Sequence, residues 1–385
     1  MKIHPLLIAL LIVYSGNCQP FIDKNSIDNK TLQHIKIPVN EYEEFTLSDA
    51  VYESKAIVLE FTKQSMIRFI LQFKIVDQHI YLLDSFGMKT LLVFDMDGNY
   101  IRSIGSSGRG PGQIPYPKDF IIDKEKQEIS VMGNMQFNRF SMDGQFKDGM
   151  KFDFSSRQFV RIGNHYFFSA PTMEDCLLYK TDEKLNKQDA LLQKRPKSFQ
   201  GDAFVAFTQK NDSEFFFRAN TNDTIYAISE NAIYPSRFID FGKNKFNYDE
   251  YMKLSPGKRM NVFMKDDYPG QCFMNRFFET SDYLYVGYIF NKSQKAYILN
   301  KNTGNYLHYD SETINDDISY FNTPGKIPKV IGTYNDYFVF AMFPHEYSSA
   351  QDLGKFLNSF SKFKKSEIET MMLETSNPIH LIGEI

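Results

Sequence analysis

The sequence predicts an all-β protein, a single six-bladed β-propeller with helical insertions on one face. The 385-residue chain is 16% aromatic, with 37 Phe and 23 Tyr, and this composition favours strands and a large core. Residues 80–112 alternate apolar and polar positions on both sides of Asp97-Gly98, and Asp-Gly is a strong hairpin signal. Asp143-Gly144 repeats that turn at the spacing of a four-stranded propeller blade, about 40–50 residues.

The amino-terminal residues 1–18, MKIHPLLIALLIVYSGNC, have the pattern of an export signal. Lys2 precedes an apolar run that is too short to span a bilayer, which needs about 20 apolar residues. The protein is therefore expected to be exported, to the periplasm or the outer cell surface. The polar residues 19–50 are expected to form a loosely packed leader, and residues 51–385 the propeller.

Cys18 is a candidate for lipidation, as in a bacterial lipoprotein. Ser15 and Gly16 precede it, whereas Asn17 departs from the small residue usual at that place. Lipid anchoring through Cys18 and ordinary signal cleavage both stay open.

Strand signals recur in six units along the chain. An early strand is expected at residues 56–60. The units in order contain strands at 70–76, 80–82, 92–94 and 100–104; at 120–123, 128–132, 137–141 and from 146; at 159–162, 165–169 and 177–180; at 214–218, 224–228 and 236–241; at 273–278, 284–289, 296–299 and 306–309; and at 330–333, 337–343 and 378–382. The last strand is expected to complete a blade with an early strand, because closure removes exposed sheet edges.

Two segments interrupt this strand pattern with helical spacing. Residues 248–264 lie between the fourth and fifth units. Residues 348–374 place Leu353, Phe356 and Phe360 three and four positions apart, which is typical of an amphipathic helix.

Charge and cysteine spacing argue against several kinds of site. The net charge of −3 and the absence of a basic stripe disfavour nucleic acid as a partner. Cys176 and Cys272 lie far apart without Cys-x-x-Cys or His spacing, so neither a metal site nor a cofactor is expected. Two buried free thiols are expected there; a disulfide between them stays open in an exported protein.

Several segments resemble the six-bladed β-propeller proteins that Bacteroidetes secrete or display, which are distantly similar to NHL-repeat propellers. The segments are IVLEFT at 57–62, residues 80–113, NDTIYAI at 222–228, RFIDFGK at 237–243 and NPIHLIGE near the end. A glutamate is common in that family where Gln113 stands. The resemblance covers nearly the whole mature chain and implies this fold and a cell-surface or periplasmic location, but no catalytic residues.

Blade geometry predicts which face binds a ligand. In an up-and-down blade the short turns at Asp97-Gly98 and Asp143-Gly144 share one face. The long connections 105–117, 244–270 and 311–328, with the insertion after Phe343, fall on the opposite face. Long irregular loops on a rigid scaffold usually carry binding, so a ligand is expected at that face and at the channel mouth it surrounds. The candidate ligand-binding residues are Asp84, Arg109, Asn134, Arg218, Asn222, Asp223, His345 and Glu346.

Each candidate also has a structural interpretation. Arginines near a channel mouth suit carboxylates, phosphates or sugar hydroxyls, yet Arg218 at a strand end can be a satisfied structural arginine. Asp84 and Asp223 can cap turns through bonds to backbone amides. The loop SSGRGPGQ lacks the Gly-Lys-Ser/Thr ending of a phosphate-binding loop, and its glycines are better explained by sharp turns.

No catalytic constellation is evident. His345-Glu346 has no second histidine at helical spacing, and no Gly-x-Ser-x-Gly elbow occurs. We therefore expect a non-catalytic binding or scaffold protein of the cell envelope, recognising a carbohydrate, peptide or partner protein. The alternatives are a hydrolase or lyase acting at the channel mouth, and an architectural ring that only holds partner proteins. Three or more Asp, Glu, His or Asn side chains converging at the channel would favour an enzyme.

Overall fold

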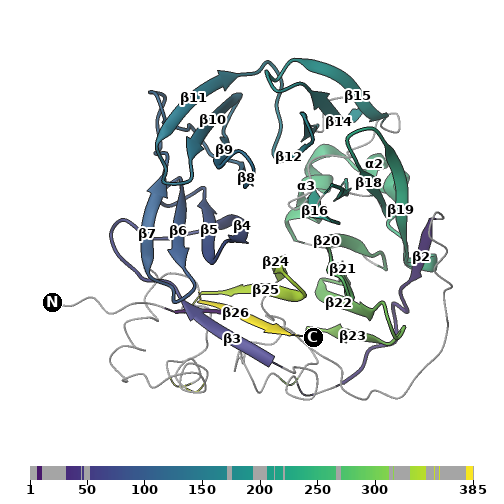
Figure 1. Ribbon diagram of the computed structural model, residues 1–385. Coiled ribbons are helices and arrows are strands. Elements are labelled where there is room, and N and C mark those ends of the chain that lie inside the picture. The colour runs from purple at the N-terminus through teal and green to yellow at the C-terminus, as the bar shows by residue number, and fades with distance from the viewer. Residues whose placement is uncertain are drawn as a thin grey trace. The chain divides into compact units, whose positions relative to one another are not determined.

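Most of the regular secondary structure in the computed structural model is antiparallel strand (Figure 1). It describes residues 7–10, 32–44, 46, 53–170, 176–193, 206–211, 213–219, 222–265, 270–311, 315, 330–343, 351, 355 and 379–384. No helix within these ranges is long and apolar enough to cross a bilayer.

Five blade-like sheets each contain four consecutive antiparallel strands. In chain order these are β4 (Ile70–Val76), β5 (His79–Asp84), β6 (Thr90–Asp95) and β7 (Tyr100–Ile104); β8 (Asp119–Asp123), β9 (Glu128–Met132), β10 (Gln136–Ser141) and β11 (Phe146–Lys151); β12 (Phe159–Ile162), β13 (His165–Ser169), β14 (Cys176–Thr181) and β15 (Lys187–Gln193); β16 (Phe207–Gln209), β17 (Phe215–Phe217), β18 (Thr224–Ile228) and β19 (Ile233–Asp240); and β20 (Phe273–Glu279), β21 (Tyr283–Phe290), β22 (Ser293–Asn300) and β23 (Tyr306–Asp310).

The other sheet combines strands from both ends of the chain. Its order is β1 (Leu7–Leu10), β3 (Glu53–Val58), β26 (Ile379–Glu384), β25 (Tyr337–Met342) and β24 (Val330–Tyr334). The antiparallel pairing of β26 with β3 confirms that the last strand joins an early one. Among the described residues, consecutive strands therefore build five blade-like sheets, where the sequence pattern predicts six units.

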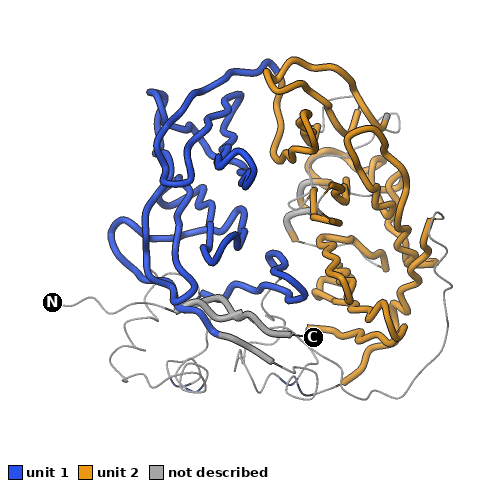
Figure 2. The backbone as a smooth tube through the Cα atoms, viewed as in Figure 1, with its two compact units in different colours: residues 1–17, 45–153, 314–385 blue, residues 18–44, 154–313 orange. Residues whose placement is uncertain are grey.

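The chain divides into two compact units (Figure 2). Unit 1 comprises residues 1–17, 45–153 and 314–385, and unit 2 comprises residues 18–44 and 154–313. Unit 1 holds the β4–β7 and β8–β11 sheets and the composite sheet. Unit 2 holds the sheets from β12 to β23.

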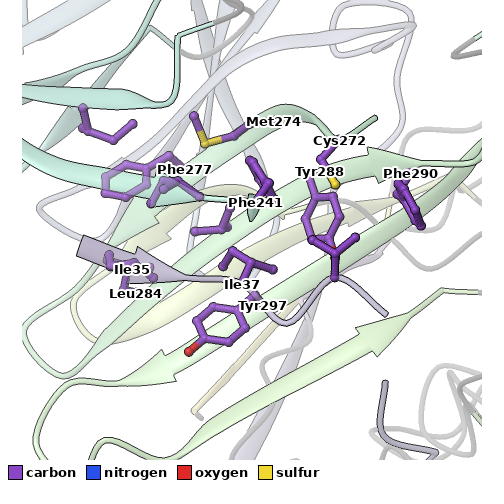
Figure 3. Packing of buried hydrophobic residues seen from close by; sticks show 14 of the residues in the cluster. Ile35, Ile37, Phe241, Cys272, Met274, Phe277, Leu284, Tyr288, Phe290 and Tyr297 are labelled. Atoms are coloured by element: carbon purple, nitrogen blue, oxygen red, sulfur yellow. The ribbon is translucent and has the colours of Figure 1, made fainter. Parts of the chain in front are cut away.

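Part of the predicted leader belongs to the core of unit 2. Strand β2 (Gln33–Lys36) pairs in parallel with β19. Ile35, Ile37 and Val39 are buried in one cluster with residues of β21 (Figure 3). The expectation of loose packing is wrong for residues 33–39. Every second residue from Ile35 to Val39 is apolar and buried, so one face of this segment packs into the core.

The middle strands of the first blade are buried on both faces. Every residue from Ile80 to Asp84 is buried, and so is every residue from Thr90 to Phe94. The alternation of apolar and polar positions described for residues 80–112, which is typical of half-buried strands, is therefore wrong for β5 and β6, because a strand that is covered on both faces needs apolar residues at successive positions. Tyr81 on one of these strands packs in the same cluster as Phe120 of the next sheet.

The predicted Asp-Gly turns are confirmed. Gly98 has φ of 85° and Gly144 has φ of 90°, values that glycine adopts without strain. A Cβ on Gly98 would lie 1.9 Å from the carbonyl oxygen of Val58, so space as well as conformation requires glycine.

Short helices occupy the segment between β19 and β20. They are the 3-10 turn η1 (Gly242–Asn244), α2 (Tyr248–Lys253) and α3 (Pro256–Met264). The Asn247 side chain accepts the Glu250 N–H and caps α2. Tyr251 packs against Phe246 in a cluster with residues of β20 and β21. The predicted helix at 348–374 lies outside the described residues except for positions 351 and 355, so the placement of helical insertions on one face stays a prediction.

Candidate binding surface

Four loops of unit 1 meet at the same end of two neighbouring sheets. The β4–β5 register pairs Ile70 with Asp84, and the β8–β9 register pairs Asp119 with Met132. The loops before β4, after β5, before β8 and after β9 therefore emerge together, and β4 contacts β8. We call residues 67–69, 85–89, 114–118 and 133–135 the aromatic loop surface.

Large apolar side chains on this surface face solvent. Phe86 is 67% exposed, Tyr116 65%, Met135 47% and Phe69 40%. The other exposed large apolar side chains in the described part of the chain are Ile101, Phe146 and Tyr234, at 38–40%. Exposed apolar side chains that gather in one place, unlike scattered ones, mark interaction sites.

Specific contacts join these loops. The rings of Phe69 and Phe86 meet edge to face, with centroids 5.4 Å apart. Lys89 Nζ lies 5.6 Å from the centroid of the Tyr116 ring. The backbone N–H of Asn134 donates to the Pro115 carbonyl at 3.2 Å, which links the last two loops. The surface is thus held as one structure.

Asp84 positions the aromatic pair. Its side chain is fully buried, and its Oδ1 accepts the N–H groups of Phe69 at 3.1 Å and Gly87 at 3.2 Å. Its Oδ2 accepts the N–H of Met88. The carboxylate of this predicted ligand-binding residue is therefore engaged with the backbone of two loops. This geometry fits the turn-capping interpretation.

The solvent-exposed charged side chains on and beside this surface are cationic, whereas the adjoining carboxylates of Asp84 and Asp119 are buried. Arg68 is exposed, Lys89 and Lys118 are partly exposed, and Lys118 Nζ lies 3.5 Å from Asn134 Oδ1. Arg109 is exposed in the adjoining loop 105–113. Residues 85–118 and 133–135 contain no Asp or Glu apart from positions 95 and 97, which lie at the opposite turn. The exposed charges on these loops are therefore positive.

The glycine-rich loop beside the surface folds around Gln113. Its Oε1 accepts the Gly110 N–H at 2.9 Å, and its carbonyl accepts Nδ2 of Asn138 at 2.9 Å. Gly105 and Gly112 both have φ of 71°. The glycines thus serve sharp turns, as the sequence indicates, and the loop leads into strand β8.

Three other predicted site residues lie in unit 2. Arg218 is 2% exposed, and its Nη1 and Nη2 donate to the carbonyls of Met274 at 2.9 Å and Asn275 at 3.1 Å. The Asn222 Oδ1 accepts the Thr224 N–H at 3.0 Å. Asp223 is buried, 3.4 Å from Lys245 Nζ. His345, Glu346 and Cys18 lie outside the described residues.

The sequence does not predict a buried polar cluster that lies in unit 2. The Tyr288 hydroxyl lies 2.8 Å from His308 Nε2, and His308 Nδ1 lies 2.6 Å from the Glu41 carbonyl. Burial lowers the pKa of His308 to about 4. Lys295 pairs with Asp310 close by. The single histidine in the strand YLHYD gives no sequence signal for this contact, which depends on residues far away in the chain.

Cys176 and Cys272 are both buried, as expected. Burial raises the pKa of the Cys272 thiol to about 12, which makes it unreactive at neutral pH. Within the described ranges no group of three or more His, Cys, Asp or Glu side chains could hold a metal ion.

Comparisons with known proteins agree with this architecture. The family model described as "Domain of unknown function (DUF4934)" matches residues 32–384. The crystal structure of a Bacteroides fragilis protein that is inferred to be exported aligns with 92% of this chain and 99% of its own, at 19% identity and a TM-score of 0.74. That likeness and the blade-like sheets show an all-β propeller fold. No curated protein sequence matches the chain.

Two further solved structures are only distantly similar. A protein of unknown function from Bacteroides caccae has 8% identity and a TM-score of 0.40, with 61% of this chain and 78% of that chain covered. BamB from Moraxella catarrhalis has 9% identity and a TM-score of 0.37, with 66% and 69% covered. Likenesses at this level carry no functional argument.

Proposed function

The chain belongs to the DUF4934 family of β-propellers, and from this premise we propose that it is a non-catalytic binding protein of the bacterial cell envelope. The aromatic loop surface docks an acidic segment of a partner protein. In this proposal the composite sheet is the sixth blade. The signal-like residues 1–18 and the exported Bacteroides fragilis relative support export; a lipid anchor at Cys18 is the tethered form of the same proposal.

The observation that carries the proposal is the joint exposure of aromatic and cationic side chains. Aromatic residues, Met and Arg are the types enriched at protein–protein interfaces. Phe86 and Tyr116 each expose about two thirds of their surface, so their rings project outward instead of lining a pocket. The cations Arg68 and Lys89 beside them favour a partner with Asp or Glu next to apolar side chains.

Substituting the aromatic residues tests this proposal. The probe is an array of synthetic peptides that combine Asp and Glu with Leu and Phe, read against the purified mature protein. We expect Phe86→Ala and Tyr116→Ala each to weaken binding of the selected peptides by about 30-fold, the size of a typical interface hot spot. Titration by fluorescence anisotropy measures the loss.

Ile101→Ala is the matched control. Ile101 is 38% exposed in the same unit, but on strand β7, so its loss should leave the affinity unchanged. Equal affinities for all variants would contradict the proposal. Binding of polygalacturonate with no peptide binding would instead assign the surface to an acidic polysaccharide.

A further inference from the structure

A bulge in β20 brings two arginines of unit 2 to one carbonyl oxygen. The β20–β21 register shifts between Met274 and Arg276. The carbonyl of Asn275, inside the bulge, accepts Nη2 of Arg218 at 3.1 Å and Nη1 of Arg276 at 3.1 Å. Gly287 faces the bulge, where an added Cβ would lie 2.9 Å from the Cβ of Arg276. The bulge therefore brings both guanidinium groups within hydrogen-bond distance of the same carbonyl oxygen.

The Arg218 guanidinium is buried, and one of its hydrogen-bond donors has no acceptor. Its Nε is buried without a hydrogen-bond partner, and its two other nitrogens donate to neutral carbonyls. Burial, with the nearby Arg276 charge, lowers the pKa of Arg218 to about 9, and Asp223 opposes that shift. Asp223 is itself within 3.4 Å of Lys245 Nζ. A buried cation with an unmet donor is costly unless a counter-charge is supplied.

Arg161 in the same unit shows the contrasting arrangement. Its Nε also lacks a partner, but its Nη2 donates to the Glu183 carboxylate at 3.1 Å. Its charge is therefore met by an acidic side chain. An Nε without an acceptor therefore does not by itself distinguish Arg218 from Arg161. Arg218 differs because Arg276 lies nearby and because its Nη1 and Nη2 donate to neutral carbonyls.

We propose that Arg218 and Arg276 form a binding site for a small oxyanion, the carboxylate, sulfate or phosphate group of a ligand. Guanidinium groups match the geometry of such anions, and a second positive charge strengthens the attraction in a buried setting. The Arg218 Nε–H supplies a donor that no protein atom uses. Because that atom is enclosed, the bound group must be small, and its entry requires a side chain to move. This site is independent of the aromatic loop surface.

Anion titrations of the full mature protein test the site. Sodium sulfate, phosphate and acetate are compared with sodium chloride at equal ionic strength, by thermal unfolding and calorimetry. We expect saturable stabilisation by at least one oxyanion beyond the chloride effect. Arg276→Gln should weaken that binding by about tenfold or more, equivalent to about 1.4 kcal/mol.

Two further variants separate the site from general stability. Arg161→Gln, which removes an arginine already paired with a carboxylate, should leave the oxyanion affinity unchanged. Arg218→Lys keeps the charge but removes the Nε donor, and should weaken binding even if the fold is intact. Equal stabilisation by all salts, or oxyanion binding that persists in Arg276→Gln, would overturn the proposal.

Discussion

Asp84 and Phe86 lie two residues apart, and only one of them faces solvent. A carboxylate at a strand end predicts a ligand contact and a turn cap equally well, and the structure places Asp84 inside, bonded to the backbone. Phe86 is an apolar residue beside Gly87, and the sequence around it does not indicate whether the ring lies in the core or faces solvent. The difference depends on how the loop folds around the Asp84 oxygens.

His308 is predicted to make stability depend on pH. Its folded-state pKa of about 4 lies below the ordinary 6.5, so below pH 6.5 the unfolded state binds a proton that the folded state does not. The free energy of unfolding should fall by up to about 3 kcal/mol as pH decreases from about 6.5 to about 4. Urea titrations across this range measure the change.

His308→Gln supplies the control. The groups that face this ring are Tyr288, Tyr42, Tyr297, the Glu41 carbonyl and the nearby Lys295. The variant cannot bind the proton, so its stability should depend less on pH over the same interval. An identical slope in both proteins would show that other groups cause the effect.

At the scale of strands, turn residues decide what the sequence can predict. The predicted bounds of β4, β9, β12, β13 and β18 match the structure, because turn or loop signals flank each of these strands. The sequence pattern does not predict β15 (KQDALLQ), an outer strand with a polar sequence, or the three-residue β16. It also missed β2, whose parallel partner β19 lies far along the chain.

Strand β2 should contribute to the stability of unit 2. Ile35 is 2% exposed and packs in the core, so Ile35→Ala should lower the free energy of unfolding by about 3 kcal/mol. Chemical denaturation measures this loss. Lys36→Ala on the exposed side of the same strand should change stability by no more than about 0.5 kcal/mol. Equal effects of the two substitutions would show that the leader does not pack as described.

At the scale of the whole molecule, the fold class was predictable and the binding surface was not. The repeated Asp-Gly turns and strand spacing are local signals, and they lead to the propeller fold. The aromatic loop surface combines loops of two sheets, so its members share no motif. The loop pattern predicts the face that carries Asp84, Arg109 and Asn134, but it indicates polar residues there and gives no signal for Phe86 and Tyr116.

Removal of β26 tests how the composite sheet holds the chain together. A chain that ends before residue 377 leaves β25 and β3 with unpaired edges, which recruit other strands. We expect aggregation and loss of cooperative unfolding, measured by light scattering and circular dichroism. A synthetic peptide of residues 377–385 should restore the monomer, whereas deleting Ile385 alone should have no effect. A stable monomeric truncated protein would contradict this role of β26.

The pairing of β3 with β26 also determines when the composite sheet can form during biosynthesis. A polypeptide that emerges amino end first has to carry β3 without its partner β26 until residues 379–384 have been made. If the chain is exported as proposed, transport as an extended polypeptide suits it, since the composite sheet is then completed only after release. A prematurely terminated product keeps an unpaired strand edge, and that edge favours its aggregation or proteolysis.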